Sequence, residues 1–289
     1  MLWWLSVIVF GLTSQLTECA SGQASVVVGP DGNIADSLQS SDREAFNIRY
    51  EIVDGVETIW TKTLEKPVGT AVLLHGCNHG ATDWFDRSEF CPTCGFGSEG
   101  WGLPEEKAVV RYAQSRDLAV VVLSSDDRDG SKCWNPRVDA TKVSNALDSL
   151  LSRPGNEALN EGPLYVFGAS SGGSFAALFP VFLRRRDGTP FNIGGIAVQI
   201  SSGGGLLKSI QTGRLVVDAI PPVALLHMPR DQRTAKGVDA LQQKLVALGS
   251  AVKVVALRPL TVNAQFFSTR VEEVRWYYHH SLFIGCNCE

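Results

Sequence analysis

The chain has 289 residues, of which 44% are hydrophobic and 19% charged, and its mean hydropathy is +0.03. This balance provides enough apolar side chains for a sizeable core and excludes an intrinsically disordered chain. The formal net charge is −4, the pI is near 5.8, and no basic block extends beyond Arg184 to Arg186. The sequence therefore lacks the electrostatic footprint of a nucleic-acid-binding protein, and no nucleic-acid partner is expected.

The first residues have the pattern of a secretory leader. The segment MLWWLSVIVFGLTSQLTECASG, residues 1–22, has an apolar stretch of about ten residues followed by small polar ones, which is too short to span a bilayer comfortably. We interpret it as a signal peptide, with residues 23–289 forming a single domain. No Lys or Arg precedes the apolar stretch, so an uncleaved anchor or a buried terminal strand stays open as the alternative. Membrane contact is expected only through such an anchor, and the oligomeric state is left open.

Strand patterns begin at residue 46. FNIRYEIVDGVETIW, residues 46–60, alternates apolar and polar positions around Asp54-Gly55, which predicts an antiparallel hairpin. Later runs are almost continuously apolar and rich in β-branched residues, as parallel strands buried on both faces require. These predicted parallel strands are residues 70–76, 118–125, 163–170, 194–202, 222–228 and 251–259.

Helical spacing appears between these strands. It predicts helices at residues 104–115, 140–152, 173–185 and 235–249. Alternation of strand and helix with right-handed crossovers predicts the α/β class. The expected architecture is a three-layer α/β/α sandwich around a mostly parallel sheet, with the antiparallel hairpin at its edge.

A cysteine-rich loop interrupts this alternation at residues 77–102. It is too long for an ordinary strand-to-helix connection, and such loops commonly cover a site. Loss of the leader would remove Cys19 and leave an even number of cysteines, which favours disulfides in an oxidising compartment and hence secretion or the secretory lumen. Free thiols and a zinc site of four thiolates are the alternatives. The disulfide candidates, whose pairing the spacing does not decide, are Cys77, Cys91, Cys94, Cys133, Cys286 and Cys288.

The motif that carries chemistry is Gly168-Ala169-Ser170-Ser171-Gly172, which fits G-x-S-x-G between a predicted strand and a predicted helix. A nucleophile on a sharp strand-to-helix turn has a strained backbone, and small residues such as Gly168 and Gly172 are needed to avoid collisions with neighbouring main chain. The turn would present the Ser170 hydroxyl above the sheet. A tight glycine-rich loop or a phosphate cradle would show the same five residues.

Partners for Ser170 are expected at other strand ends. The apolar strand that ends in His75-Gly76 suggests the Cys77 amide as one oxyanion donor beside the Ser171 amide, with His75 structural rather than a base. Asp231 follows a strand and is the candidate that orients a histidine, or else a helix N-cap or turn residue. Chain order excludes His75 and His79, disfavours His227, and leaves His279 and His280, which also fit a surface tail or a core edge.

These features together resemble the α/β-hydrolases over roughly residues 46–267. The segments VLLHGCNHGATDWF, CPTCG, LPEEKAVV and SSDDRDGSKCW are similar to poorly characterised secreted or membrane-associated hydrolase-like proteins of plants and algae. The resemblance implies that Ser170 is the nucleophile, Asp231 the acid, and Cys77 with Ser171 the oxyanion donors. The C-terminal SLFIGCNCE departs from the longer helical tail expected to carry the family's histidine.

The expected activity is that of a serine hydrolase that cleaves carboxylic esters through an acyl-enzyme on Ser170. The expected partner is a small-molecule, ester-like substrate, and neither a cofactor nor a metal is expected. The alternative is a catalytically impaired binding or scaffold protein that has the hydrolase fold but lacks a properly placed histidine.

Overall fold

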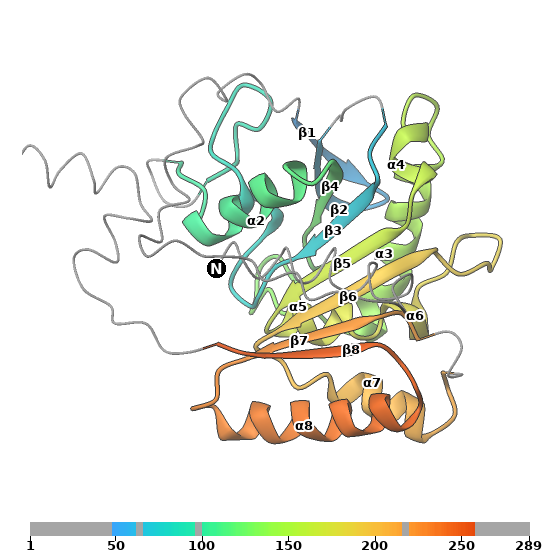
Figure 1. The fold of residues 1–289 in the computed structure, drawn as a ribbon. Coiled ribbons are helices and arrows are strands. Elements are labelled where there is room, and N and C mark those ends of the chain that lie inside the picture. Colours follow the sequence, from blue (N-terminus) through green and yellow to red (C-terminus); the bar gives the residue numbers. More distant parts are fainter. Residues whose placement is uncertain (1–47, 62–65, 96–99, 216–219, 258–289) are drawn as a thin grey trace, which may run out of the picture.

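The computed structural model describes residues 48–61, 66–95, 100–215 and 220–257. In these ranges one eight-stranded sheet forms in the order β1-β2-β4-β3-β5-β6-β7-β8 (Figure 1). β2 is antiparallel to both of its neighbours, and every later pair is parallel. The predicted mostly parallel sheet with an antiparallel edge is confirmed. The strands are β1 Ile48–Val53, β2 Val56–Thr61, β3 Gly69–Leu74, β4 Leu118–Leu123, β5 Leu164–Ala169, β6 Ile193–Gln199, β7 Val223–His227 and β8 Val252–Ala256.

The edge hairpin turns at the residues that the sequence indicates. Asp54 has a φ of 48° and Gly55 a φ of 81°, and Val53 pairs directly with Val56. Two central residues with positive φ match the right-handed twist of the flanking strands, and Asp-Gly adopts this conformation at little cost.

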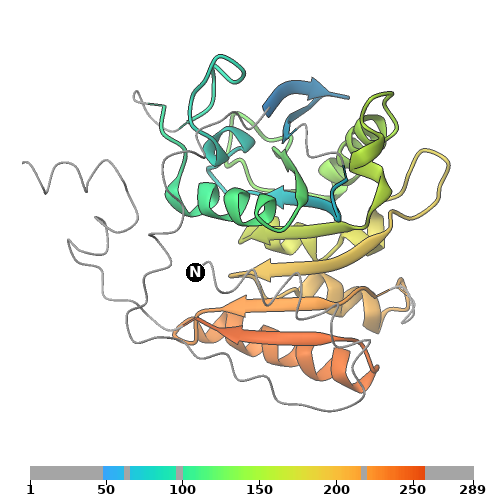
Figure 2. The same cartoon turned by 45° about the horizontal axis from the view of Figure 1, so that its top comes forward.

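Helices cover both faces of the sheet and complete the three predicted layers. Along β3, Ala71 and Leu73 pack beneath α2, whereas Val72 and Leu74 belong to the core under the other helices, as the alternation of side chains in a strand requires. Figure 2 shows α2 on the near side of the sheet and α8 on the far side. The helices are η3 Ala81–Trp84, α2 Pro104–Gln114, α3 Pro136–Leu151, α4 Glu157–Glu161, α5 Ser171–Ala176, α6 Phe179–Phe182, α7 Gly204–Gln211 and α8 Gln232–Ala247.

Several helix boundaries differ from the prediction. The single helix expected at residues 173–185 is two short helices, α5 and α6, because Pro180 has no N–H to continue α5 and instead lies in the first turn of α6. α3 begins before Ala140, since the Asn135 side chain caps it by accepting from Arg137 N at 3.1 Å. α7 was not predicted because it opens with glycines, which have low helix propensity.

No helix in the described ranges combines the length and the apolar character needed to cross a bilayer. The predicted signal peptide or anchor at residues 1–22 lies outside the described residues, and so do His279, His280, Cys286 and Cys288.

Candidate active site

Ser170 occupies a sharp turn between strand β5 and helix α5. Its φ of 54° and ψ of −115° are strained for a residue with a side chain, at a cost of about 1–3 kcal/mol. Hydrogen bonds on both sides hold the turn: Ser170 N donates to Gln199 O at 2.8 Å, and Ser174 N donates to Ser170 O at 3.0 Å. The strand, the turn and the helix that G-x-S-x-G predicts are therefore all present around Ser170.

The glycines of the motif allow three stretches of backbone to approach one another. A methyl group on Gly168 would lie 2.2 Å from the Gly172 carbonyl oxygen. One on Gly172 would lie 2.4 Å from the His75 oxygen and 2.5 Å from the Leu74 oxygen. All of these are main-chain atoms and cannot rotate aside, so glycine at both positions fixes the turn directly against the end of β3.

Three serines lie close together here, and their hydroxyls differ in environment. Ser174 Oγ is hydrogen-bonded to Ser201 Oγ at 2.8 Å. Ser171 Oγ is buried and has no hydrogen-bond partner within the described part of the chain. Ser170 is partly exposed, and no described side chain hydrogen-bonds to its hydroxyl. Among them, Ser170 thus offers the hydroxyl that is both accessible and unpaired.

The end of β3 lies against the turn that carries Ser170. β3 and β5 are adjacent and parallel, with Leu74 opposite Gly168. A methyl group on Gly76 would lie 3.6 Å from Ser170 Cβ. Neither the next amide, Cys77 N–H, nor Ser171 N–H donates a loop or turn hydrogen bond within the described residues. Unpaired amides close to a nucleophile can stabilise the negative charge that develops on a carbonyl oxygen.

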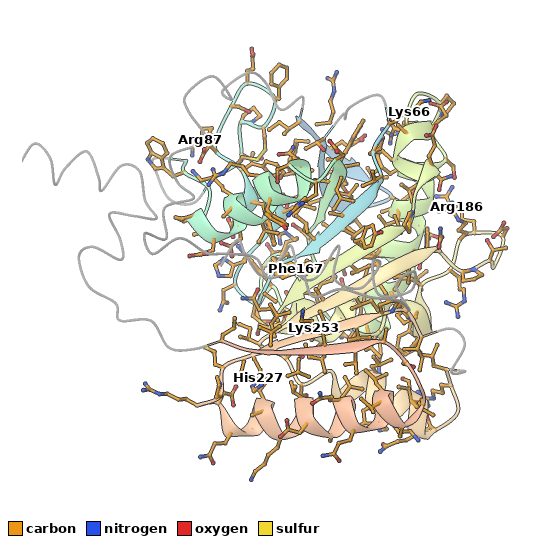
Figure 3. The ribbon with its side chains drawn as sticks, in the orientation of Figure 1. Lys66, Arg87, Phe167, Arg186, His227 and Lys253 are labelled. Atoms are coloured by element: carbon orange, nitrogen blue, oxygen red, sulfur yellow. A yellow bond between two sulfur atoms is a disulfide. The ribbon has the colours of Figure 1, made fainter. Side chains whose placement is uncertain are left out.

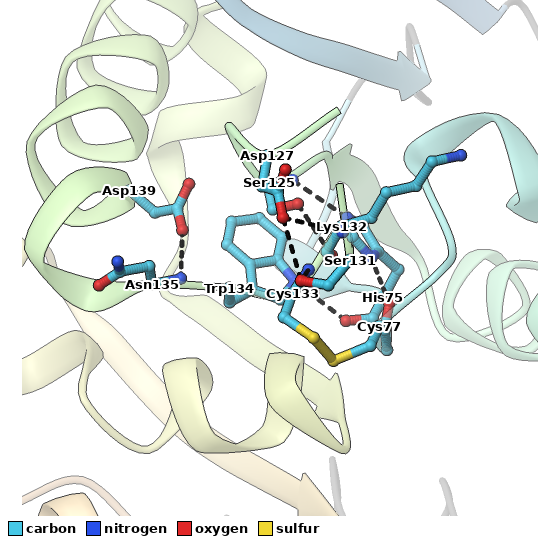
Figure 4. Close-up of a disulfide and its surroundings, with 11 residues drawn as sticks. His75, Cys77, Ser125, Asp127, Ser131, Lys132, Cys133, Trp134, Asn135 and Asp139 are labelled. Carbon is cyan, nitrogen blue, oxygen red and sulfur yellow. Dashed lines mark hydrogen bonds between the residues drawn. A yellow bond between two sulfur atoms is a disulfide. The ribbon is translucent and has the colours of Figure 1, made fainter. Parts of the chain in front are cut away.

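The loop that carries Cys77 is attached firmly to the segment after β4. Figure 4 shows the disulfide that joins the two segments. Hydrogen bonds add to it on both sides of the loop, so its backbone is fixed before any ligand binds. The contacts are the Cys77–Cys133 disulfide, Asn78 N to Ser131 O at 2.8 Å, Ala81 N to Ser124 Oγ at 2.8 Å, and Arg128 Nη1 to His79 O at 3.4 Å.

His75 has a structural role, as the sequence suggested. Burial lowers its pKa to about 4, so the ring is neutral near pH 7. Ser125 N–H donates to His75 Nε2 at 3.0 Å, so Nδ1 carries the hydrogen and donates to Gly76 O at 2.6 Å (Figure 4). Because both ring nitrogens are occupied, His75 cannot accept a proton from Ser170.

His79 is a second histidine of this loop, and the order of triad residues along the chain had excluded it as the catalytic base. Its Nδ1 lies 3.0 Å from Asp83 Oδ2, and the same oxygen accepts from Gly80 N at 3.0 Å. The Asp83 side chain is 11% exposed and the His79 side chain 37%. The spacing of four residues between a histidine and an aspartate is the signal in the sequence that could have indicated this pair.

Asp231 lies after β7 and caps helix α8. Its side chain is exposed and accepts from Thr234 N at 3.1 Å. Hydrogen bonds from Thr234 hold the pKa of this carboxyl below its usual range. The structure therefore gives Asp231 an N-cap contact, while its predicted partners His279 and His280 lie outside the described residues, so the predicted triad stays a prediction.

The strand order, the antiparallel β2 and the strained serine between β5 and α5 define the architecture. The chain has the α/β-hydrolase fold.

Comparison with known proteins finds similar solved structures at low sequence identity. No protein-family model and no curated protein matches the chain. Brefeldin A esterase, a bacterial homologue of human hormone-sensitive lipase, is 15% identical with a TM-score of 0.46 over 81% of this chain and 74% of its own. An inhibited esterase B from Lactobacillus rhamnosis is 15% identical with a TM-score of 0.44, over 70% and 69% of the two chains. An acetyl ester-xyloside bifunctional hydrolase from Caldicellulosiruptor lactoaceticus is 13% identical with a TM-score of 0.45, over 78% and 88%.

Four of the predicted disulfide cysteines are paired in the structure, as Cys77–Cys133 and Cys91–Cys94. Their sulfurs are thus not available as zinc thiolates, which removes the alternative of a four-thiolate site formed by these residues. Within the described ranges no group of at least three His, Cys, Asp or Glu side chains could hold a metal ion.

Removing the Cys77–Cys133 disulfide is expected to destabilise the protein substantially. The crosslink spans 56 residues of sequence, for which the loop-closure entropy amounts to roughly 4 kcal/mol, against roughly 2 kcal/mol for the Cys91–Cys94 link across 3 residues. Urea unfolding of the Cys77→Ala/Cys133→Ala variant measures this loss. The m-value should rise, because the unfolded chain becomes more expanded. A loss below about 1 kcal/mol with an unchanged m-value would contradict the expectation.

Proposed function

We propose that this chain is a serine hydrolase that cleaves carboxylic esters through an acyl-enzyme on Ser170. The observation that carries the proposal is the strained turn that presents a partly exposed, unpaired Ser170 hydroxyl against the end of β3. Such backbone strain persists only where the surrounding structure over-determines the conformation, and strained residues cluster at active sites. The similar solved structures include esterases and an acetyl ester hydrolase, which agrees with this substrate class.

The reaction proceeds in two acyl-transfer steps. Ser170 Oγ attacks the ester carbonyl carbon as its proton passes to an imidazole, and the carbonyl oxygen becomes an oxyanion held by the Cys77 and Ser171 N–H groups. Collapse of this intermediate expels the alcohol, which takes the proton from the imidazolium. Water then attacks the acyl-enzyme by the same route and releases the acid. Each oxyanion donor typically contributes a factor of about 10²–10³ to kcat.

The imidazole and the carboxylate that orients it come from one of two candidate pairs. Asp231 with His279 or His280 is the combination that the sequence suggests for this reaction. The described residues hold a second pair, His79 and Asp83.

We further propose that the protein acts in the secretory pathway or outside the cell. The Cys77–Cys133 and Cys91–Cys94 disulfides support an oxidising compartment, where such bonds persist. The resemblance of the cysteine-rich loop to secreted or membrane-associated hydrolase-like proteins of plants and algae favours the same compartment.

A covalent probe tests the proposed nucleophile directly. A fluorophosphonate should label the native protein, and mass spectrometry of the digest should place the adduct on Ser170, because only an activated serine reacts at an appreciable rate. Incubation of urea-unfolded protein is the control, since unfolding removes the activation. A folded protein that stays unlabelled would argue against hydrolysis and favour the alternative, a binding or scaffold protein that retains the fold without a base.

A further inference from the structure

We propose that His79, oriented by Asp83, is the imidazole that takes the proton of Ser170. This inference rests on the proposed function and assigns its acid–base group. Two observations meet here: a histidine whose one ring nitrogen is held by a buried carboxylate, and its position over the same glycine as the nucleophile.

The first step of the argument is the position of the ring. A methyl group on Gly76 would lie 3.6 Å from Ser170 Cβ and 4.0 Å from His79 Cδ2. The two side chains therefore flank the same small volume above the end of β3. In an imidazole ring Cδ2 is bonded to Nε2, so the edge of the ring nearest to Gly76 carries Nε2, while Nδ1 contacts Asp83.

The second step is the state of the ring. A carboxylate only accepts hydrogen bonds, so the 3.0 Å contact with Asp83 Oδ2 places the hydrogen of a neutral His79 on Nδ1. Nε2 then carries the lone pair, and no described group hydrogen-bonds to it. This is the tautomer that a general base needs, and a carboxylate behind Nδ1 also stabilises the imidazolium that forms.

The third step is how firmly the pair is held. Asp83 Oδ2 also accepts from Gly80 N at 3.0 Å, and Leu103 N donates to the Asp83 carbonyl at 2.7 Å. Arg128 fixes the backbone of His79 and packs so closely on Gly80 that a methyl group there would meet its Nη2 at 2.5 Å. The pair is thus preorganised by main-chain contacts on both sides.

Charged groups from the neighbouring elements also face the pair. Glu106 on α2 is near: burial raises the pKa of its carboxyl, and of its charged neighbours His79 lowers that pKa and Asp83 raises it. Arg128 is also near, with its Nη2 3.1 Å from Glu57 Oε2. These carboxylates offset the Arg128 charge, so an imidazolium at His79 forms in a mixed field rather than a positive one.

The other histidines in the described ranges do not meet these conditions. His75 uses both ring nitrogens in hydrogen bonds. His227 lies at the end of β7, away from Phe167 on β5 in Figure 3, and its Nδ1 is buried with no hydrogen-bond partner in the described structure. On this fold the acid and the base usually follow the nucleophile in the chain, so His79 with Asp83 departs from the usual order, although the same three groups occur in other orders on unrelated folds.

The proton balance of the step is complete. The Ser170 Oγ–H proton moves to His79 Nε2 as Oγ bonds to the ester carbon, and the carbonyl π electrons move to the oxygen. The imidazolium returns that proton to the departing alkoxide. Deacylation repeats the sequence with water, which supplies the proton and the hydroxyl group.

Two variants test the pair by steady-state hydrolysis of p-nitrophenyl acetate. In His79→Ala, kcat/KM should fall by about 10³-fold or more, and added imidazole should restore part of it because the site is partly exposed. In Asp83→Asn, the wrong tautomer should reduce kcat by about 10⁴-fold with little change in KM. Imidazole should rescue neither Asp83→Asn nor a Ser170→Ala variant.

A matched control and a second substitution keep the test decisive. Asp86→Asn makes the same chemical change a few residues away, at a carboxylate paired with Lys107 Nζ at 2.8 Å, and should leave kcat/KM within about threefold of the native value. If His79→Ala fails to fold, His79→Gln keeps a donor for Asp83 but has no basic nitrogen, and should show the same loss. A folded His79 variant that retains native kcat/KM overturns the inference while Ser170 labelling still supports the hydrolase; absence of labelling in the native protein overturns both.

Discussion

Replacement of Ser170 by alanine is expected to reduce kcat for ester hydrolysis by at least about 10³-fold, because it removes the atom that forms the acyl-enzyme. The residual rate would come from the oxyanion donors and from binding alone. Hydrolysis of a p-nitrophenyl ester, followed in the steady state, measures the loss. Ser174→Ala is the matched control: it lies one turn further along α5, its hydroxyl is hydrogen-bonded to Ser201, and it should retain native kcat.

The strained backbone at Ser170 leads to a second prediction, which concerns the stability of variants at this position. A φ of 54° strains alanine as it strains serine, whereas glycine adopts this region freely. Ser170→Gly should therefore be more stable than Ser170→Ala by about 1 kcal/mol in urea unfolding, even though both are inactive. Native-like kcat in Ser170→Ala would refute the nucleophile, and equal stability of the two variants would show that the turn is relaxed.

Gly172→Ala is expected to destabilise the protein strongly. Its new methyl group would lie 2.4 Å from the His75 oxygen and 2.5 Å from the Leu74 oxygen, both of them main-chain atoms at the end of β3. Either the Ser170 turn or the end of β3 must shift, which we expect to cost about 3 kcal/mol of unfolding free energy. The same shift would separate Ser170 from the Cys77 amide, so kcat should fall along with stability. Denaturant unfolding and steady-state hydrolysis measure the two effects.

The control for this substitution is Gly204→Ala, in the first turn of α7. Its methyl group would meet only Ser202 Oγ at 3.4 Å, an ordinary contact, and its φ is not positive. Alanine should leave stability unchanged or raise it by up to about 1 kcal/mol through the unfolded state. A Gly172→Ala protein as stable as Gly204→Ala would mean that β3 and the turn are not packed as described.

Local patterns predicted the sheet and the turn well. Continuous β-branched runs indicated strands buried on both faces, and β3 to β8 are parallel neighbours as expected. The pattern Gly168-x-Ser170-x-Gly172 indicated a strained turn, and Ser170 has the positive φ that such a turn requires. Helix ends were predicted less well, since Pro180 divides one predicted helix and glycines conceal the start of α7.

The sequence by itself determined the sheet, its direction and the residue at its sharpest turn, because periodicity and glycine placement act over a few neighbouring residues. Only the tertiary structure decided that Cys77 pairs with Cys133 and that Ser170 and His79 flank the same glycine, Gly76. These contacts join strand ends far apart in the chain. Their geometry depends on how β3, β4 and β5 align in the sheet, which no local pattern encodes.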